Sequence, residues 1–536
     1  MSKKQGNYLS GGSIKVKENG WIERISLSIR PPSLEDNRGD LDRLLFSIRP
    51  IVGDCKIDMP LDLISKIPNF LRSYHYKTDI LYFKDDNILK IIDLFPVDSN
   101  LPLYGIAIDL GTSNIALSLI DIVKGKEIYF QNILNPQIKV GPDILSRIHF
   151  AEDNRKLAEL QEMVIDAINR EIEDMIHKIG IKREHLVGMS VAGNTTMSHL
   201  FLSLDPHWIC REPYIPCANR FPILRAKELG ISINQNAPVF IFPDVGSYLG
   251  GDIISGIFSL GLEGSERLFC FIDVGTNAEI IIGSREWMIG CAGAAGPALE
   301  GGVGSIGMMA AKGVIDRISY DANEDRFKIR LIGDGSPKGL CGSAMIDLIS
   351  ELFLNGFLDG RGRFVKERCK ERLGYREGEI RFFIFRPGEF YSLNEGLYIT
   401  QAEVDSLIRS KAAMYTILRT ITKMLDIDFN DIHRFYIAGS FGSYMNPRSA
   451  INIGMLPDIP IERFKVCGNT SLEGAKRLFF ERDGIRRIYS IRDNITYVEL
   501  NVNQEFMNLF SGAKFLPHTD ISLFPSVKKR LSSVLR

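Results

Sequence analysis

Long apolar runs are absent from this sequence. Among its 536 residues no stretch of about 18 consecutive apolar residues occurs, so the sequence predicts no membrane-spanning helix. The N-terminal segment MSKKQGNYLSGGSIKVKENG includes basic side chains but no apolar core, which is not typical of a secretory signal. We therefore expect a cytoplasmic protein.

A surplus of either charge is also absent. Lys and Arg together number 65 and Asp and Glu 66, which leaves a net charge of −1. Without a basic surplus, general binding to nucleic acid or to an anionic membrane is not expected. The apolar content of 45% is ordinary for a globular protein. Because a single core stops growing near ~250–300 residues, we expect several domains.

Clustered cysteines are the third absence. The eight cysteines form no C-x-x-C pair and no tight group with histidine, which argues against a disulfide framework and a structural zinc site. The sequence also lacks G-x-x-x-x-G-K-[ST], so a P-loop site is not expected. GGVGSIG at 301–307 matches G-x-G-x-x-G, but Gly313 interrupts any helix beyond it, and we interpret it as a flexible active-site loop.

Strand-like and helix-like segments alternate along the chain. Residues 1–100 have the pattern of a small α/β domain, with strands on both sides of the Asn19-Gly20 turn. After Tyr104 a strand hairpin leads to a long helix around 155–179, where apolar residues recur every three or four positions. A second hairpin begins at Phe269. This alternation predicts an α/β fold with substantially parallel sheets.

The two hairpins share one pattern: an apolar strand, Asp, Gly-Thr, a short polar residue and a second strand. They read IAIDLGTSNIAL at 106–117 and FIDVGTNAEIII at 271–282. The turn amides and hydroxyls can bind phosphate, and the Asp can hold Mg²⁺ directly or through water. A single copy would be an ordinary turn. Two copies predict two lobes that present phosphate-binding turns to a shared cleft, with these candidates: Asp109, Gly111, Thr112, Ser113, Asp273, Gly275, Thr276 and Asn277.

A third glycine turn follows the strand in YIAGSFGSYMNP. Its candidate residues are Gly439, Ser440, Phe441 and Gly442. Taken alone, this turn would be a tight connection between a strand and a helix. Beside two phosphate hairpins it predicts the clamp for the adenosine of ATP.

These motifs carry a resemblance to a superfamily. IDLGTSNIALSLID, IDVGTNAEIII, IAGSFG and GNTSLEGAKRLFF resemble the first phosphate, second phosphate, adenosine and second connecting motifs of acetate and sugar kinases, Hsp70 and actin. The resemblance implies a two-lobed actin-like ATPase of ribonuclease H-like fold with ATP and Mg²⁺ between the lobes. We expect an N-terminal domain over 1–100, lobe I over 104–265, lobe II over 266–485 and a strand–helix extension over 486–536.

Further motifs resemble one family within that superfamily. NPQIKVGPDILSRI, AGNTTMSHL, PDVGSYLGGD, GCAGAAGPALEGG and GLCGSAMIDLI are similar to the reductive activators of corrinoid proteins, ATPases that help return cob(II)amide to cob(I)amide. The resemblance runs from about Pro31 to the C-terminus, and RPPSLEDNRGDLDRLL is similar to the middle domain of that family. It implies lobes that open and close with ATP, and a corrinoid or similar low-potential metalloprotein as partner. A homodimer is left open.

The resemblance adds further candidate residues. Asp252 lies in a connecting helix whose superfamily counterpart places an acidic or polar residue near the γ-phosphate, where it would position water; the alternative is an acid that stabilises the helix N-terminus. Asn194 and Thr195 would face the cleft or simply cap a helix. Gly342 and Ser343 belong to the GLCGSAMIDLI motif and are expected to contact the cofactor. His199 is expected to be a packed histidine rather than a base.

One departure concerns electron transfer. The corrinoid activators usually carry an iron–sulfur domain with C-x₄-C-x₂-C spacing, whereas here only Cys55 precedes Cys210 and no cysteine follows Cys467. We expect no iron–sulfur cluster in this chain and a separate iron–sulfur protein as electron donor. The length and layout also resemble the methanogenesis marker protein 14 family, which has no cluster.

Three functional hypotheses remain at this stage. The first is an ATPase that activates or remodels a metalloprotein, with Asp109, Asp252 and Asp273 as catalytic residues. The second is a small-molecule kinase of the acetate or sugar kinase type. The third is a nucleotide-dependent scaffold that does not hydrolyse ATP. A shared fold alone does not distinguish them.

Overall fold

The computed structural model divides the chain into two compact units. It describes residues 20–98, 100–275, 277–294, 306–308, 311–376, 378–389, 395–439, 445–499 and 504–534. Unit 1 comprises Met1–Ser255 and Ser471–Arg492, and unit 2 comprises Gly256–Thr470 and Asp493–Arg536. The chain therefore leaves unit 1 within helix α8 (Gly251–Leu260). It returns for α13 (Thr470–Leu478) and α14 (Gly484–Asn494) and ends in unit 2.

The N-terminal part of unit 1 is a four-stranded sheet with helices. The strand order is β1-β3-β4-β2. β3 and β4 form an antiparallel hairpin, which turns at Asp86, a residue with φ of 50°. The strand predicted before Asn19 lies outside the described residues. The elements are β1 (Ile22–Ser28), α1 (Asp40–Val52), β2 (Lys56–Asp58), α2 (Leu61–Ile64), α3 (Ile67–Ser73), β3 (Lys77–Asp85) and β4 (Ile88–Phe95).

The rest of unit 1 is built on a six-stranded mixed sheet of order β7-β6-β5-β8-β10-β9. β8 lies parallel to both β5 and β10, while the other neighbours are antiparallel. The sheet is thus less parallel than expected, because short turns can join only antiparallel strands. Its strands are β5 (Tyr104–Leu110), β6 (Asn114–Asp121), β7 (Lys126–Leu134), β8 (Leu186–Gly193), β9 (Leu224–Arg225) and β10 (Pro238–Ile241).

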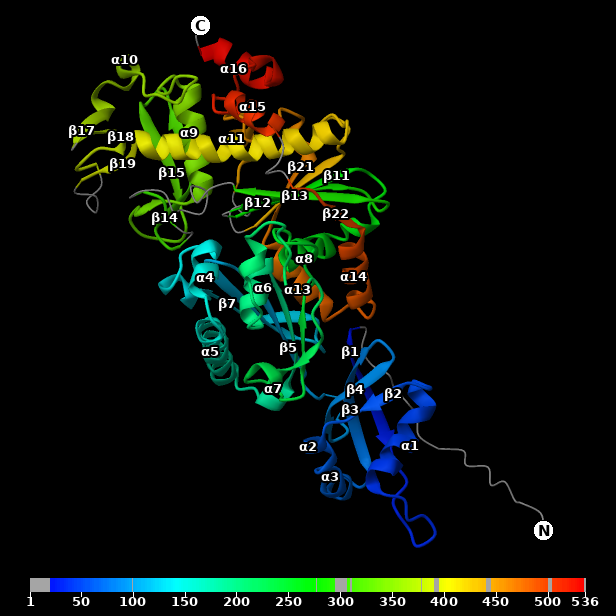
Figure 1. Cartoon of the computed structure of the whole chain (residues 1–536). Helices are drawn as coiled ribbons and strands as arrows, with labels where there is room; N and C mark the ends of the chain where they lie inside the picture. Colours follow the sequence, from blue (N-terminus) through cyan, green and yellow to red (C-terminus); the bar gives the residue numbers. More distant parts are fainter. Residues whose placement is uncertain are drawn as a thin grey trace. The chain divides into compact units, whose positions relative to one another are not determined.

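Helices cover both faces of this sheet. The predicted long helix is observed as α5, which packs beside α6 and shares one core with β5, β6, β8 and β10 (Figure 1). On the other face, the hydroxyl of Ser190 donates to the carbonyl of Ala475, and Tyr489 packs against Phe240. The helices are α4 (Ile144–Phe150), α5 (Asn154–Ile179), α6 (Thr195–Phe201), α7 (Ala226–Leu229), α8 (Gly251–Leu260), α13 (Thr470–Leu478) and α14 (Gly484–Asn494).

The four-stranded sheet is joined to the rest of unit 1 by an aromatic cluster. Trp21 is buried, with ring centroids 6.1 Å from those of Phe240 and Phe479. Arg225 also donates to the carboxylate of Asp58 at 2.8 Å. The two parts of unit 1 have separate hydrophobic cores and are connected by these contacts.

Unit 2 repeats the sheet plan of unit 1. Its six-stranded sheet has the order β21-β20-β11-β12-β13-β22, so an antiparallel meander again continues into parallel neighbours. The long helix α11 packs on this sheet. The elements are β11 (Phe269–Val274), β12 (Asn277–Gly283), β13 (Met288–Ala294), β20 (Arg434–Ala438), β21 (Phe464–Gly468), β22 (Ile495–Tyr497), α11 (Gln401–Met424) and α12 (Pro447–Asn452).

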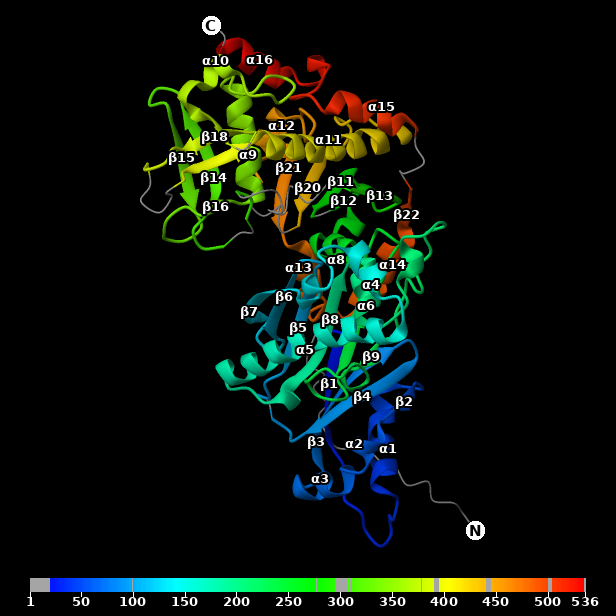
Figure 2. The same cartoon turned by 60° about the vertical axis from the view of Figure 1, so that its left-hand side comes forward.

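Two three-stranded sheets and the C-terminal helices complete unit 2. The sheets have the orders β15-β14-β16 and β17-β18-β19, and α15 lies along α11 (Figures 1 and 2). The elements are β14 (Val314–Asp321), β15 (Arg326–Leu331), β16 (Gly339–Leu340), α9 (Gly342–Leu354), α10 (Lys366–Cys369), β17 (Leu373–Arg376), β18 (Glu379–Phe385), β19 (Leu397–Thr400), α15 (Gln504–Ala513) and α16 (Pro525–Val534).

The fold bears on three features predicted from sequence: the absence of a membrane-spanning helix, the glycine loop and the domain boundaries. Within the described residues no helix is both long and apolar enough to cross a membrane. The glycine loop predicted at 301–307 lies outside the described residues, apart from its last two positions. The domain boundaries stay a prediction. Helix α13 was assigned to lobe II, and α14 was assigned to the C-terminal extension apart from residues 484 and 485; residues 471–492 of these helices pack in unit 1.

Candidate functional site

The first acid-bearing turn joins β5 to β6. Asp109 lies near the end of β5, and Gly111, Thr112 and Ser113 form the turn. A Cβ on Gly111 would lie 2.6 Å from the carbonyl oxygen of Asn114, so the turn closes this tightly only with glycine. The N–H groups of Thr112 and Ser113 donate no hydrogen bond within the described part of the chain. Unpaired amides in a tight turn are suited to bind phosphate.

Buried residues hold this turn from behind. Asn135 donates from its side chain to the carbonyl of Gly111 and from its main chain to the carbonyl of Ser113, both at 2.9 Å. Arg147 donates from Nη2 to the carbonyl of Thr112 at 2.6 Å. Both side chains are fully buried. Both residues belong to the motif NPQIKVGPDILSRI, but no role was predicted for either of them from sequence.

Asn194 connects the turn to the next strand. Its Oδ1 accepts from the N–H of Met197 at 3.0 Å and so caps α6, and its Nδ2 donates to the hydroxyl of Thr112 at 3.0 Å. The capping interpretation is therefore observed, while the role of Asn194 in the cleft stays a prediction. The hydroxyl of Thr195 is buried and donates to the carbonyl of Gly246 at 2.6 Å, so it serves the fold.

Asp252 lies at the start of α8, close to the same turn. The approach is tight, because a Cβ on Gly250 would lie 2.4 Å from the Cα of Asn194. Burial, followed by the negative charge of Asp109, raises the pKa of Asp252 to about 7. A carboxyl group with a pKa near neutrality can accept a proton from water, which goes beyond the water-positioning role predicted from sequence.

A residue missed from sequence lies against Asp109. The hydroxyl of Ser471, at the start of α13, donates to Oδ1 of Asp109 at 2.7 Å. The two residues are 362 positions apart. The second connecting motif, GNTSLEGAKRLFF, contains Ser471 and was the signal that could have identified it.

A second buried acid supports α8. Oδ1 of Asp244 accepts from the N–H of Gly251 at 3.0 Å, and burial together with the charge of Asp252 raises the pKa of Asp244 well above its usual value. His199 lies nearby: its Nδ1 bonds to the carbonyl of Thr195 at 2.7 Å, and burial lowers its pKa. His199 is thus a packed, hydrogen-bonded histidine, as expected.

The second acid-bearing turn, in unit 2, follows the same plan. Asp273 near the end of β11 pairs in register with Ala438 of β20, as Asp109 pairs with Ala192 of β8 in unit 1. In both cases glycine follows the alanine. Gly439 has φ of +94°, and a Cβ there would lie 2.6 Å from Oδ1 of Asp273. The N–H of Gly275 donates to the carbonyl of Asn277 at 2.9 Å and closes the turn.

The remaining candidates have different positions. Gly342 and Ser343 begin α9, and the buried hydroxyl of Ser343 donates to the carbonyl of Asp316 at 3.3 Å, so its observed contact is with β14. Four candidates lie outside the described residues: Thr276, Ser440, Phe441 and Gly442.

The donor set fits ATP and Mg²⁺ better than a metal held by protein alone. Within the described residues no group of three or more His, Cys, Asp or Glu side chains could hold a metal ion. Mg²⁺ takes only one or two carboxylates and keeps water and phosphate oxygens as its other ligands. Asp109 in unit 1 and Asp273 in unit 2 are carboxylates of that kind, and their role as magnesium ligands stays a prediction.

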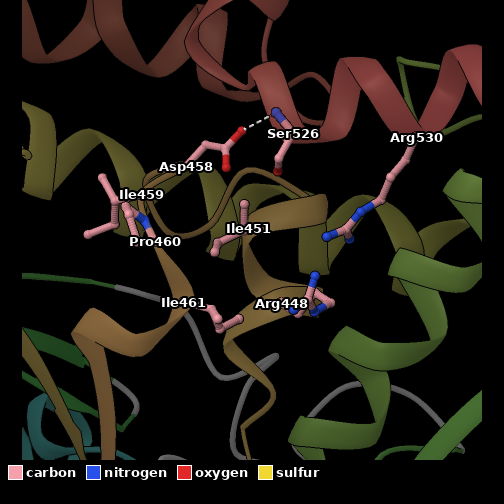
Figure 3. Close-up of a pocket in the computed structure, with 8 residues that line it drawn as sticks. All are labelled: Arg448, Ile451, Asp458, Ile459, Pro460, Ile461, Ser526 and Arg530. Carbon is pink, nitrogen blue, oxygen red and sulfur yellow. Dashed lines mark hydrogen bonds between the residues drawn. The ribbon is translucent and has the colours of Figure 1, made fainter.

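A hollow in unit 2 involves none of these residues. It has a volume of about 290 Å³ and lies between α12, the loop before β21 and α16. Figure 3 shows Arg448 and Arg530 pointing toward each other, while Asp458 accepts from the N–H of Ser526 at 2.7 Å. Asp458 thereby caps α16 and attaches the C-terminal helix to the unit.

Comparisons with known proteins identify the family. Residues 15–100, 104–265 and 267–528 match models for the RACo linker region, the RACo middle region and the C-terminal ASKHA domain of RACo. The chain is 30% identical over 430 residues to the corrinoid activation enzyme RamQ of Eubacterium limosum, which covers 78% of this chain and 72% of that protein. This chain belongs to the RACo family, the reductive activators of corrinoid proteins.

Two further RACo relatives support the assignment. A reductase for the Co(II) methylated amine-specific corrinoid protein of Methanosarcina barkeri is 22% identical over 436 residues, 76% of each chain. The solved structure of a reductive activator for a corrinoid, iron–sulfur protein has a TM-score of 0.88 and 36% identity, and the match covers 95% of this chain and 81% of that one. The predicted family and actin-like fold are confirmed. The resemblance to methanogenesis marker protein 14 stays a hypothesis.

Proposed function

We propose that this protein is an ATP-dependent activator that returns a corrinoid protein, or a similar low-potential metalloprotein, to its active reduced state. The observation that carries the proposal is the 30% identity to a corrinoid activation enzyme over 78% of the chain. The two acid-bearing turns support it, since each has the residues that ATP and Mg²⁺ require.

We propose the following roles for residues of the chain. The amides of Thr112 and Ser113 bind phosphate oxygens, and Asp109 and Asp273 hold Mg²⁺, which supplies charge stabilisation to the phosphates when bound. Asp252 accepts a proton from the attacking water, which its raised pKa permits near neutral pH. The turn at Gly439 belongs to the adenosine clamp.

The reduction itself needs one electron, because cob(II)amide becomes cob(I)amide by gaining one. We propose that this electron comes from a separate iron–sulfur protein, since the eight cysteines have no spacing that suits a ferredoxin-type cluster and four of them are buried. ATP then acts by favouring the state of the partner that can accept the electron.

The test measures ATP hydrolysis together with the absorbance of the corrinoid, which reports the oxidation state of its cobalt. The purified protein should hydrolyse ATP slowly alone and faster with its corrinoid partner, and cob(I)amide should accumulate only when ATP and a low-potential donor are both present. Asp109→Asn and Asp273→Asn should each remove most hydrolysis while the far-UV circular dichroism stays unchanged. Full activity in both variants at saturating Mg·ATP would contradict the proposal.

A small-molecule kinase is the second candidate, because Asp252 could also accept the proton of an acceptor hydroxyl. Phosphate transfer from labelled ATP to a panel of sugars, acetate and glycerol separates the two. We expect no phosphorylated product. One robust product that is lost in Asp252→Ala would decide for the kinase.

A further inference from the structure

We propose that Arg147 is a built-in counter-charge for the phosphates that bind the Gly111–Ser113 turn, and that it makes ligand affinity depend on ligand charge. The inference rests on the proposed function, because it concerns the same nucleotide. It assigns a role to a buried cationic side chain that forms no ion pair with a described residue.

The guanidinium of Arg147 is fully buried and fixed by four contacts. Nη2 donates to the carbonyl of Thr112 at 2.6 Å, and Nε donates to the carbonyl of Gly141 at 3.0 Å. Nη1 lies 3.2 Å from both Oε1 of Gln137 and Sδ of Met197. A Cβ on Gly141 would lie 2.9 Å from the N of Arg147, so only glycine lets that carbonyl come so close. The position of the charge is therefore set by the fold.

None of these four acceptors carries a charge. Arg147 forms no ion pair within the described residues, although Asp143 raises its pKa from a greater distance. Asp143 is itself engaged, since its carboxylate accepts from the N–H and the hydroxyl of Ser146 at 2.9 and 2.7 Å. Burying a cation without a partner anion is costly, so an anion bound on the turn would offset that cost.

The same contacts aim the amides of the turn outward. The peptide bonds here are trans, so each C=O points opposite to the N–H of the following residue. Asn135 holds the carbonyl of Gly111, which directs the N–H of Thr112 away from Asn135. Arg147 holds the carbonyl of Thr112 and directs the N–H of Ser113 in the same way. A charged donor on that carbonyl also polarises the peptide and strengthens its N–H as a donor.

The two amides that are turned outward have no partner in the described chain. The turn therefore offers two donors on its open side and one positive charge behind it. This arrangement favours a phosphate over a neutral ligand of the same size, and it favours ATP over AMP, because added negative charge interacts with the fixed cation through protein rather than through water.

The test is a series of ligands that differ in charge. Binding of adenosine, AMP, ADP and ATP is measured by calorimetry in excess Mg²⁺ for wild type, Arg147→Met, Arg147→Gln and Arg147→Lys. We expect Arg147→Met to change the dissociation constant of adenosine by no more than about twofold and to raise that of ATP roughly 30-fold. The increases for AMP and ADP should lie between these two values. Arg147→Lys should restore part of the dependence on charge, and Arg147→Gln should not. The exposed Arg155→Met is the matched control and should bind like wild type.

A purely structural role predicts a different result. It would lower the melting temperature of the ligand-free protein and weaken all four ligands alike, and that outcome would overturn the inference. Should Arg147→Met fail to fold, the comparison of Arg147→Lys with Arg147→Gln decides, since only the lysine keeps the charge. A wild-type protein that binds none of the four ligands would overturn the proposed function, and the inference with it.

Discussion

Asp252 shows how the ionisation of one carboxyl group depends on another. It lies at the start of α8, where the interior disfavours its ionised form and the charge of Asp109 disfavours it further. Because the native protein binds this proton more tightly than the unfolded chain does, stability falls as pH rises from the usual carboxyl value of 3.8 toward about 7.

We therefore expect Asp252→Asn to stabilise the protein at alkaline pH. At pH 8 in EDTA its free energy of unfolding should exceed that of wild type by about 2–4 kcal/mol, whereas at pH 4 the two should agree. Urea unfolding at both pH values measures the difference. The exposed Asp166→Asn on α5 is the control and should change neither value. Parallel pH profiles for wild type and Asp252→Asn would contradict the expectation.

Ser471 is expected to act through Asp109. Its hydroxyl bonds to Oδ1, and losing a hydrogen bond to a charged group costs about 1.5–3 kcal/mol. Ser471→Ala should therefore raise the Mg²⁺ concentration needed for half-maximal ATP binding roughly tenfold. Titration of a fluorescent ATP analogue with Mg²⁺ measures it. Ser471→Thr keeps the hydroxyl and should remain close to wild type; an equal loss in both variants would mean that packing, not the hydrogen bond, matters.

The sequence predicted the acids and the glycines of the proposed site but not the residues that contact them. Asp109 and Gly111 are recognisable because strand, acid and glycine are neighbours in the chain. Ser471 lies 362 positions after Asp109 in the sequence, so no local sequence pattern predicts their contact. Arg147 looks like an ordinary arginine of a short helix, and its burial follows from three separate segments that surround it.

At the scale of elements, the spacing of apolar residues predicted a helix that depends on contacts between near neighbours in the sequence. Helix α5 was expected around 155–179 and is observed at Asn154–Ile179, where Asp153 caps its first turn. The sheets formed by β14–β16 and β17–β19 were not predicted. Each includes a strand of only two to four residues, and one pairing in each has a register shift that alternation alone does not show. The parallel pairing of β8 with β5 likewise depends on contacts distant in sequence.

The C-terminal segment is attached by a buried lysine. Nζ of Lys411, in α11, donates to the carbonyls of Phe515 and Pro517 at 2.5 and 2.7 Å, and burial lowers the pKa of Lys411 well below its usual value. Lys411→Met leaves both carbonyls without a donor, so we expect a loss of about 2–5 kcal/mol in the free energy of unfolding.

Limited proteolysis should show where that loss acts. In Lys411→Met we expect cleavage near α15 and α16 before the rest of the chain is cut. The exposed Lys528→Met on α16 removes the same charge without a buried contact and should be cut like wild type. Equal protection of Lys411→Met and Lys528→Met would show that the lysine does not hold the segment.

At the scale of the molecule, the two units repeat one design. In each, an acid stands near the end of a strand whose parallel neighbour continues as Ala-Gly, and an antiparallel meander lies on the other side. The repetition explains why one sequence pattern occurs twice, 164 residues apart.

The packing of unit 1 depends on Phe479, which is far along the sequence from most of that unit. Phe479 is 1% exposed and packs against Trp21, whereas its neighbour Phe480 is 37% exposed. Phe479→Ala should destabilise unit 1 by about 3–5 kcal/mol and shift the emission of Trp21 to longer wavelength, because a large cavity opens beside the indole. Phe480→Ala should lower the free energy of unfolding by about 0.5 kcal/mol or less. Equal midpoints of denaturation for the two variants would contradict this account of the packing.

Because residues 471–492 pack in unit 1, this unit cannot be completed until late in translation. The ribosome must make all of residues 256–470 before α13 and α14 exist, which at roughly 5–20 residues per second takes on the order of 10–40 s. During that interval the sheet face around Ser190 and Phe240 has no helix to cover it. A nascent chain halted before Ser471 should therefore bind a holding chaperone, and one released after Arg492 should not.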